Sequence, residues 1–376
     1  MIQYKDNHRT AIITWINYYN FGTFLQAYAL QKAIETLGYP NKVIDDIRYI
    51  DLRKPSIKWQ FIHLCVNILH PRRVFMNNLL QSRRFKKFAK QNINIDHDWT
   101  STSELTKHYD TFVCGSDQIW STYAKDFHDG FYYASFVEDK NKLLAYAPSL
   151  GAKANYSRIY ADTVKPWLDK FEVLAIRETS GAEIVRNITG RDDIHIVLDP
   201  TLLLSRIQWL EFVKSNKGKY KPIKESYMLA YFLTYNEKYL ARAYQLAHSR
   251  GMKLVCLNTC KVSKKFADKI VIGTGPVEFL NLVASAEAVF TDSFHGTIFA
   301  MHFHKPFITF KRFSNSDSTN QNSRIENLFQ IVGISDNFLD ENTLYRMPGN
   351  PDWKNIEKNL NSRRMESIQI LKNALD

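Results

Sequence analysis

The sequence lacks acidic residues over one long interval. The chain contains 38 Asp and Glu, but none lies between Asp51 and Asp96. Most of the formal net charge of +12 therefore comes from the basic residues of this interval. They are Arg53, Lys54, Lys58, Arg72, Arg73, Arg83, Arg84, Lys86, Lys87 and Lys90. Such a segment can bind an anionic membrane surface or nucleic acid, or can be the solvated face of helices. Since no nucleic-acid-binding motif accompanies residues 52–95, we expect no nucleic acid as a partner and favour an anionic membrane surface.

Cysteine is scarce, with four residues in a chain of 376, and its spacing is not that of a metal site. Cys256 and Cys260 lack the spacing of a zinc knuckle and have no His pair nearby, so we predict no metal. Free thiols fit a reducing cytoplasm. No apolar run approaches the ~20 residues of a membrane span, and the first residues lack the apolar core of a signal peptide. We therefore expect a cytoplasmic protein, bound at most peripherally to the inner membrane face.

The usual phosphate-binding motifs are missing as well. Gly273-Thr-Gly275 begins like a dinucleotide fingerprint, but Pro276 follows and the third glycine is absent. We interpret these residues as a turn before a helix that begins with proline. The chain has neither a P-loop nor the Gly-x-Ser-x-Gly elbow of α/β-hydrolases.

Short apolar runs alternate with amphipathic stretches, which is typical of an open parallel sheet covered by helices. The predicted strands are 11–16, 42–47, 111–116, 143–149, 173–178, 195–200, 227–233, 253–257, 288–290 and 306–310. The predicted helices are 23–37, two within 55–91, 156–170, 180–188, 238–249, 276–286, 296–303, 324–332 and 356–375. The length favours two α/β domains facing across a cleft. We place them at 1–190, with a basic helical insertion at about 52–95, and at 191–345, while a helix in 346–376 packs back on the first domain.

One stretch, Ala288–Phe303, is predicted to run from a buried strand through a polar turn into an apolar helix. The carboxyl edge of a parallel sheet is where such proteins bind ligands, and a helix N-terminus favours an anion. His295 lies at this tip, where it could act as a general acid near neutral pH. The alternative is that His295 only caps or packs the helix start.

Other predicted strand ends carry reactive side chains that should gather at the same edge. Arg177 can hold a phosphate or carboxylate through two hydrogen bonds, or it can form an ion pair with Glu178 or Asp199. In the Gly115–Trp120 loop, a hydroxyl, a carboxylate and an amide could bind sugar hydroxyls, with the indole against the ring. The alternative for that loop is a helix N-cap. A polar loop, Ser314–Ser323, is a possible lid before Arg324.

Several motifs in order resemble those of the polysaccharide pyruvyl transferase family. They are Gly22–Gln31, Val113–Trp120, Ala175–Gly181, Val197–Leu203, Gly273–Leu280 and Thr291–Thr297. The resemblance implies two Rossmann-like domains, similar to the GT-B glycosyltransferase fold, with an acceptor side in the first and a donor side in the second. It also implies transfer of the enolpyruvyl unit of phosphoenolpyruvate to a sugar of a bacterial-type cell-surface polysaccharide or its lipid-linked precursor. The product is a cyclic ketal, and no metal or redox cofactor is required.

The resemblance also implies site residues. His295 would be the general acid, and Asp117 would accept the proton of the attacking hydroxyl. The expected donor-binding residues are Arg177, Ser293, His295, Gly296, Thr297, Lys311 and Arg324. The expected acceptor-binding residues are Asn20, Gly22, Gln26, Ser116, Asp117, Gln118 and Trp120. Active family members commonly carry an Arg-Leu-His order where this chain has Ser293-Phe294-His295. Either Lys311 or Arg324 supplies the missing charge, or the donor differs.

Two other functions remain open from the sequence. A nucleotide-sugar glycosyltransferase on the same fold would need a diphosphate site in the second domain. Glu278 and Glu287 stand one residue further apart than the two glutamates of many such enzymes, which counts against it. A non-catalytic glycan-binding or assembly protein is the other alternative, and the Ser-Phe-His departure favours it. The oligomeric state is left open.

Overall fold

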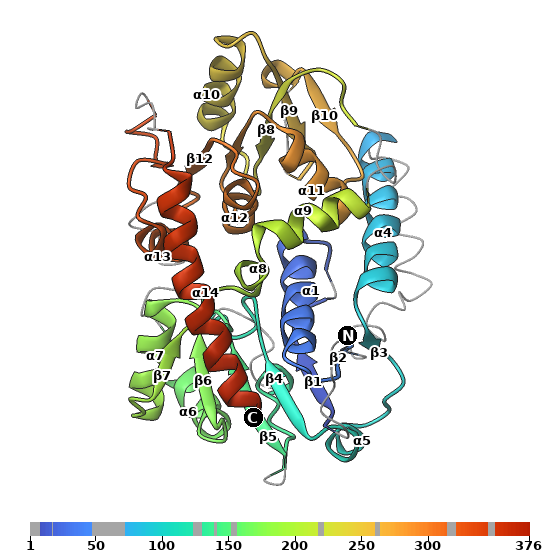
Figure 1. Cartoon of the computed structure of the whole chain (residues 1–376), viewed down its shortest axis with the longest axis vertical. Helices are drawn as coiled ribbons and strands as arrows, with labels where there is room; N and C mark the ends of the chain where they lie inside the picture. The colour runs from blue at the N-terminus through green and yellow to red at the C-terminus, as the bar shows by residue number, and fades with distance from the viewer. Residues whose placement is uncertain are drawn as a thin grey trace.

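The computed structural model describes residues 8–16, 18–46, 72–122, 130–138, 141–151, 156–216, 222–259, 264–313, 321–344 and 350–376. These residues form two sheets in which every paired strand is parallel. Helices surround both sheets, so the α/β class predicted from the sequence is confirmed (Figure 1).

The first sheet has the order β3-β2-β1-β4-β5-β6-β7. Its strands are β1 (Thr10–Ile13), β2 (Asn41–Ile44), β3 (Ile95–Asp96), β4 (Thr111–Cys114), β5 (Lys142–Tyr146), β6 (Val173–Ile176) and β7 (Ile194–Ile196). The second sheet has the order β10-β9-β8-β11-β12-β13. Its strands are β8 (Tyr227–Tyr231), β9 (Lys253–Leu257), β10 (Lys269–Val271), β11 (Ala288–Thr291), β12 (Phe307–Phe310) and β13 (Phe338–Leu339).

The helices of the first half are α1 (Phe21–Thr36), α4 (Arg72–Asn92), α5 (Thr102–His108), α6 (Arg158–Leu168), α7 (Thr179–Thr189), α8 (Pro200–Leu203) and α9 (Arg206–Ser215). Those of the second half are α10 (Glu237–His248), α11 (Pro276–Ser285), α12 (Phe294–His302), α13 (Ser323–Val332) and α14 (Trp353–Leu375). None of these described helices is long and apolar enough to cross a membrane.

Each sheet reverses its strand order once, between β1 and β4 in the first and between β8 and β11 in the second. At such a switch point the connecting helices leave toward opposite faces, so a crevice opens beyond the carboxyl ends of the two central strands. The chain segments that follow these four strands are therefore the ones expected to bind ligands.

The boundary between the two halves differs from the predicted one. The strand predicted at 195–200 was assigned to the second domain, but β7 pairs with β6 and belongs to the first sheet, which extends beyond residue 190. The strand also stops early. Asp199 accepts a hydrogen bond from the backbone N–H of Thr201, and Pro200 occupies the first turn, so α8 begins where a strand was predicted.

Two helices tie the halves together. α14 runs from the second half along the first (Figure 1), where its Ser367 accepts a hydrogen bond from Leu198 N (3.0 Å) and Arg364 Nε donates to Leu202 O (2.6 Å). α4 begins directly after Pro71 and is the second of the two helices predicted within 55–91. The first of those two helices lies outside the described residues.

α4 was expected to lie over the first domain, but it also contacts the second. Arg84 Nη1 donates to Gly273 O (2.8 Å), and Arg84 Nε lies 3.2 Å from Glu278 Oε1. Phe21 of α1 stacks between Phe85 of α4 and Phe279 of α11, at ring distances of 5.6 and 4.6 Å. This aromatic stack belongs to an apolar core that continues from one half into the other.

Candidate functional site

The two switch points face each other across a cavity of about 80 Å³, room for a few water molecules or a small anionic group. Its lining comes from the segments after β1, β4, β8, β11 and β12 and from the start of α13. The polar and aromatic members are Tyr18, Asn20, Asp117, Gln118, Asp292, Ser293, Phe294, His295, Arg312, Phe313, Gln321, Asn322 and Arg324. The tips after β1, β4 and β11 therefore meet as predicted.

The turn between β11 and α12 is built by short polar side chains and a glycine. Ser293 caps the helix by accepting a hydrogen bond from Gly296 N, and Thr297 Oγ1 donates to Ser293 O (3.0 Å). A Cβ on Gly296 would lie 2.4 Å from Thr291 Oγ1, so only glycine fits there. Of the four predicted donor residues in this turn, Ser293 and His295 line the cavity, whereas Gly296 and Thr297 shape the turn behind it.

His295 lies between elements of both halves. Its Nε2 is 3.5 Å from Asp199 Oδ2, and a Cβ added to Gly22 of α1 would lie 1.9 Å from its Nδ1. The side chain is 7% exposed, and Nε2 has no hydrogen-bond partner among the described residues. Gly22 was predicted to bind the acceptor, but its visible function is to leave room for this imidazole.

Asp199, which sequence reasoning left without a catalytic role, links His295 to Arg177. Arg177 Nη1 donates to Asp199 Oδ2 (2.8 Å), while the hydroxyl and backbone N–H of Thr201 donate to the other oxygen. Burial raises the pKa of the Asp199 carboxyl, but the nearby His295 and Arg177 outweigh burial and hold that pKa below its usual range. Asp199 is therefore an anion at neutral pH. The local signal was the Asp-Pro-Thr sequence of a helix N-cap.

Arg177 and Arg324 approach the same aromatic ring. Their guanidinium carbons lie 5.0 and 5.8 Å from the centroid of Phe294. Arg177 forms the predicted ion pair with Asp199, and its Nε lies 3.6 Å from Glu178 Oε2. Its Nη2, like Nε of Arg324, is buried without a hydrogen-bond partner among the described residues. Arg177 does not line the cavity between the sheets, but both arginines border a smaller cavity of about 10 Å³ beside Phe294. Buried N–H groups of this kind indicate a site for an anion.

Both guanidinium groups stay charged at neutral pH. Burial, followed by the neighbouring charge of Arg177, lowers the pKa of Arg324 to about 10. Burial also lowers the pKa of Arg177, but the carboxylates of Asp199 and Glu178 more than offset this and raise it above its usual value. The pair therefore keeps its two positive charges beside the cavity.

Lys311, a predicted donor residue, does not reach the cavity. Its Nζ lies 3.7 Å from Asp340 Oδ2 and 5.5 Å from the ring centroid of Phe338. Successive residues along a strand direction point to opposite sides, so it is Arg312 that lines the cavity, with Nε donating to Thr234 Oγ1 (2.8 Å). The sequence prediction gave this place to the neighbouring residue, Lys311.

Asp292 joins the two loops of the second switch point. Its carboxylate accepts hydrogen bonds from Leu233 N (2.6 Å) and Thr234 N (3.0 Å). Burial raises the pKa of Asp292 to about 6 despite these bonds. The residue thus holds the loop after β8 against the tip of β11.

On the first sheet, three predicted acceptor residues line the cavity. Asn20 caps α1 by accepting from Gly22 N (2.9 Å), and Gln118 Nε2 donates to Gln321 Oε1 (2.8 Å). Asp117 accepts a hydrogen bond from Thr23 Oγ1 (2.6 Å) and is 6% exposed. An acid and two amides thus stand together at one wall.

Three other predicted acceptor residues lie behind that wall. Gln26 and Ser116 are fully buried, and Gln26 Oε1 accepts from Ser116 N (3.1 Å), so they fix the loop after β4. Trp120 is 1% exposed, stacks on Tyr133 at 5.0 Å and donates to Tyr132 O (2.9 Å). The expectation that its indole faces a sugar is therefore wrong, because a ring from a later turn of the chain covers it.

Tyr18 takes the place that was expected for Trp120. It lines the cavity, is 42% exposed and lies edge-on to Trp15 at 5.5 Å. Although the residue is partly exposed, its hydroxyl is desolvated. This desolvation, followed by the charge of Asp117, raises the pKa of the hydroxyl, so the phenol stays neutral. The sequence signal was the aromatic pair in the loop after β1.

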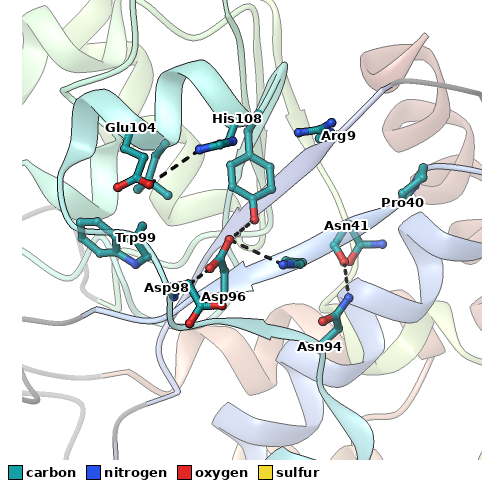
Figure 2. Close-up of a pocket in the computed structure, with 12 residues that line it drawn as sticks. Arg9, Pro40, Asn41, Asn94, Asp96, Asp98, Trp99, Glu104 and His108 are labelled. Atoms are coloured by element: carbon teal, nitrogen blue, oxygen red, sulfur yellow. Dashed lines mark hydrogen bonds and ion pairs between the residues drawn. The ribbon is translucent and has the colours of Figure 1, made fainter.

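A larger cavity, about 420 Å³, lies elsewhere (Figure 2). It borders Arg9 and Pro40, which precede β1 and β2, and so adjoins the opposite edge of the first sheet. Several of its polar groups interact with one another: Tyr109 donates to Asp96, and His108 lies 3.7 Å from Glu104. Because it adjoins neither switch point, we assign the site to the smaller cavity between the sheets.

No group of three metal-ligating side chains occurs in the part of the chain that the structure describes. Cys114 and Cys256 are buried, while Cys65 and Cys260 lie outside the described residues. Most of the predicted lid, residues 314–320, also lies outside them.

Comparison with known proteins gives a family and a fold. The family model for polysaccharide pyruvyl transferase matches residues 20–314. A search of curated proteins finds no match.

Three solved structures match this chain, and the first two, with TM-scores above 0.5, illustrate the similarity in fold. A UDP-N-acetylglucosamine 2-epimerase has a TM-score of 0.52 at 10% identity, covering 99% of this chain and 95% of that chain. The wall teichoic acid polymerase TagF has a TM-score of 0.51 at 7% identity, covering 99% and 88%. A UDP-GlcNAc 2-epimerase from Methanocaldococcus jannaschii has 0.45 at 14%, covering 93% and 98%. These low identities show the fold alone, which is the predicted pair of Rossmann-like domains similar to GT-B enzymes.

The contact between Gly22 and His295 can be tested by a double-mutant cycle. Gly22→Ala should destabilise the protein by about 1–3 kcal/mol, because the new methyl group overlaps the imidazole. In a His295→Ala background the same change should be neutral or slightly stabilising, since alanine is the better helix former. Urea denaturation of the four proteins measures the coupling. Equal costs in both backgrounds would show that the two residues are not in contact.

Proposed function

Because the chain belongs to the polysaccharide pyruvyl transferase family, we propose that it transfers the pyruvyl unit of phosphoenolpyruvate to a glycan. The acceptor is a sugar of a cell-surface polysaccharide or of its lipid-linked precursor, and the product is a ketal. The observation that carries this proposal is the pair of buried guanidinium groups, Arg177 and Arg324, with unpaired N–H groups beside His295.

The charge of the cavity suits this donor. Phosphoenolpyruvate carries close to three negative charges near neutral pH, and Arg177, Arg324 and Arg312 bring three guanidinium groups to the cavity and its border. Guanidinium groups bind carboxylate and phosphate through paired hydrogen bonds. The start of α12 adds a favourable dipole. Arg324 and Arg312 thus supply the charge that Ser293 does not.

His295 is the proposed general acid. Protonation of the methylene carbon of the donor produces a cation at the central carbon, stabilised by the enol oxygen. A sugar hydroxyl attacks that carbon, the bond to the phosphate oxygen breaks, and a second hydroxyl closes the ketal. One hydroxyl proton restores the acid and the other leaves with phosphate. Asp199, 3.5 Å from Nε2, balances the charge of an imidazolium and positions the ring.

The acceptor is proposed to lie against the first sheet. Asp117 faces the cavity and can accept the proton of an attacking hydroxyl, while Asn20 and Gln118 can bind neighbouring hydroxyls. Tyr18 offers the exposed ring face that a sugar needs. Donor and acceptor then approach each other from the two switch points.

The function is tested by incubating the purified chain with phosphoenolpyruvate and a panel of glycan acceptors. We expect phosphate release that depends on acceptor, and a new ketal methyl signal in the proton NMR spectrum of the glycan. His295→Ala should abolish both while circular dichroism stays unchanged. Turnover of a nucleotide sugar instead would support a glycosyltransferase, and the absence of both activities would support a non-catalytic glycan-binding protein.

Donor binding distinguishes Arg324 from Lys311, the two cations that the sequence analysis offered for the missing charge. Arg324→Ala should weaken phosphoenolpyruvate binding about 10- to 100-fold, because a buried charged hydrogen bond is lost. Lys311→Ala is the matched control and should leave the affinity unchanged, since Lys311 faces Asp340. Calorimetric titration measures both. An unchanged affinity in Arg324→Ala and Arg177→Ala would remove the donor site from this place.

Acceptor binding tests the role of Tyr18. Tyr18→Ala should raise the KM for the glycan about 2- to 10-fold with no change in donor affinity, because ring stacking is lost. Tyr18→Trp should restore it. Tyr235 is exposed to the same extent, 42%, and does not line the cavity, so Tyr235→Ala is the control. An acceptor KM unaffected by Tyr18→Ala would contradict the assignment.

A further inference from the structure

The outer face of α4 carries a row of cations. Arg83, Lys86, Lys87 and Lys90 are all exposed, and their spacing of three, four and seven residues places them on one side of the helix. Met76, 42% exposed, precedes Arg83 by two helical turns and lies on the same side. None of the four cations has an acidic partner among the described residues, and α4 itself contains no acidic residue. We call these four residues the α4 stripe.

The opposite face of α4 is fully occupied. Phe85 and Phe88 are 0% and 2% exposed and pack against aromatic side chains of α1. Arg84, the basic residue that turns inward, pairs with Glu278 of α11. The helix is therefore held by both halves of the molecule and lies at one side of it (Figure 1), while the four residues of the stripe are exposed.

The stripe begins at the rim of the candidate site. Tyr19 Oη and Ser82 Oγ are hydrogen-bonded at 2.8 Å, and Asn20, the next residue after Tyr19, lines the cavity. Arg83 follows Ser82 directly. A surface that contacts the stripe therefore lies next to the loop that carries the proposed acceptor wall.

We propose that the α4 stripe is the surface by which this protein binds an anionic phospholipid bilayer. The charge pattern fits a flat, negatively charged surface, since the cations lie in one row and an exposed methionine can enter the headgroup region. Each Lys or Arg near such a surface contributes a factor of about five to the affinity, so four could give several hundred-fold. Salt should weaken this binding, because the cations are exposed. The proposal does not depend on the donor chemistry.

The test is co-sedimentation of the full chain with vesicles of phosphatidylcholine alone or mixed with phosphatidylglycerol. We expect binding only to the mixed vesicles, and release by added salt. Lys86→Glu/Lys87→Glu/Lys90→Glu should lose this binding. Lys354→Glu/Lys358→Glu/Lys372→Glu is the matched control, with the same charge change at exposed positions of α14, and should keep it. Turnover of a soluble acceptor should be the same in wild type and both variants.

Three results would overturn the proposal. Equal binding to both kinds of vesicle would show that lipid charge is irrelevant. Equal loss of binding in the α4 and α14 variants would show an effect of net charge without a defined surface. Binding of duplex DNA or RNA through the stripe, without binding to anionic vesicles, would assign the surface to nucleic acid.

Discussion

The site depends on a histidine that one half of the molecule supplies and the other half holds. His295 comes from the start of α12, while Gly22 of α1 and Asp199 before α8 fix its ring. Neither sheet alone positions this imidazole. The histidine follows a strand of the second sheet, whereas the glycine lies in a helix of the first half and the carboxylate follows the last strand of the first sheet. The helices α4 and α14 matter for the same reason, since they bind the two halves to each other. The structure thus makes the arrangement of domains part of the site.

Around this contact, charge is distributed in an order that suits transfer between two substrates. Asp199 offsets part of the positive charge of Arg177, and the remaining N–H groups lie beside Phe294 and Arg324. The carboxylate of Asp117 stands on the other wall, with the neutral phenol of Tyr18 near it. An anionic donor would therefore meet the guanidinium groups of one wall. A hydroxyl-rich acceptor would meet the carboxylate of the other wall, which accepts hydrogen bonds.

Much of the fold could be predicted from local patterns, and less of the site. Apolar runs located the main strands, and the polar turn after β11 located His295, because both signals are contained in a few consecutive residues. Long-range contacts could not be read this way. Trp120 is covered by Tyr133, and Gly22 contacts a histidine from the other half of the chain. The choice between Lys311 and Arg312 depends on which side of a strand each faces, and a shift of one residue reverses it.

The central claim is that an anionic three-carbon donor binds between Arg177 and Arg324, with its methylene carbon toward His295. A crystal structure of the protein with phosphoenolpyruvate tests it most directly. The account predicts donor oxygens within hydrogen-bond distance of the free N–H groups of both arginines, and the imidazole of His295 next to the donor carbon. A structure in which the donor binds elsewhere, while a nucleotide sugar occupies the second domain through its diphosphate, would contradict it.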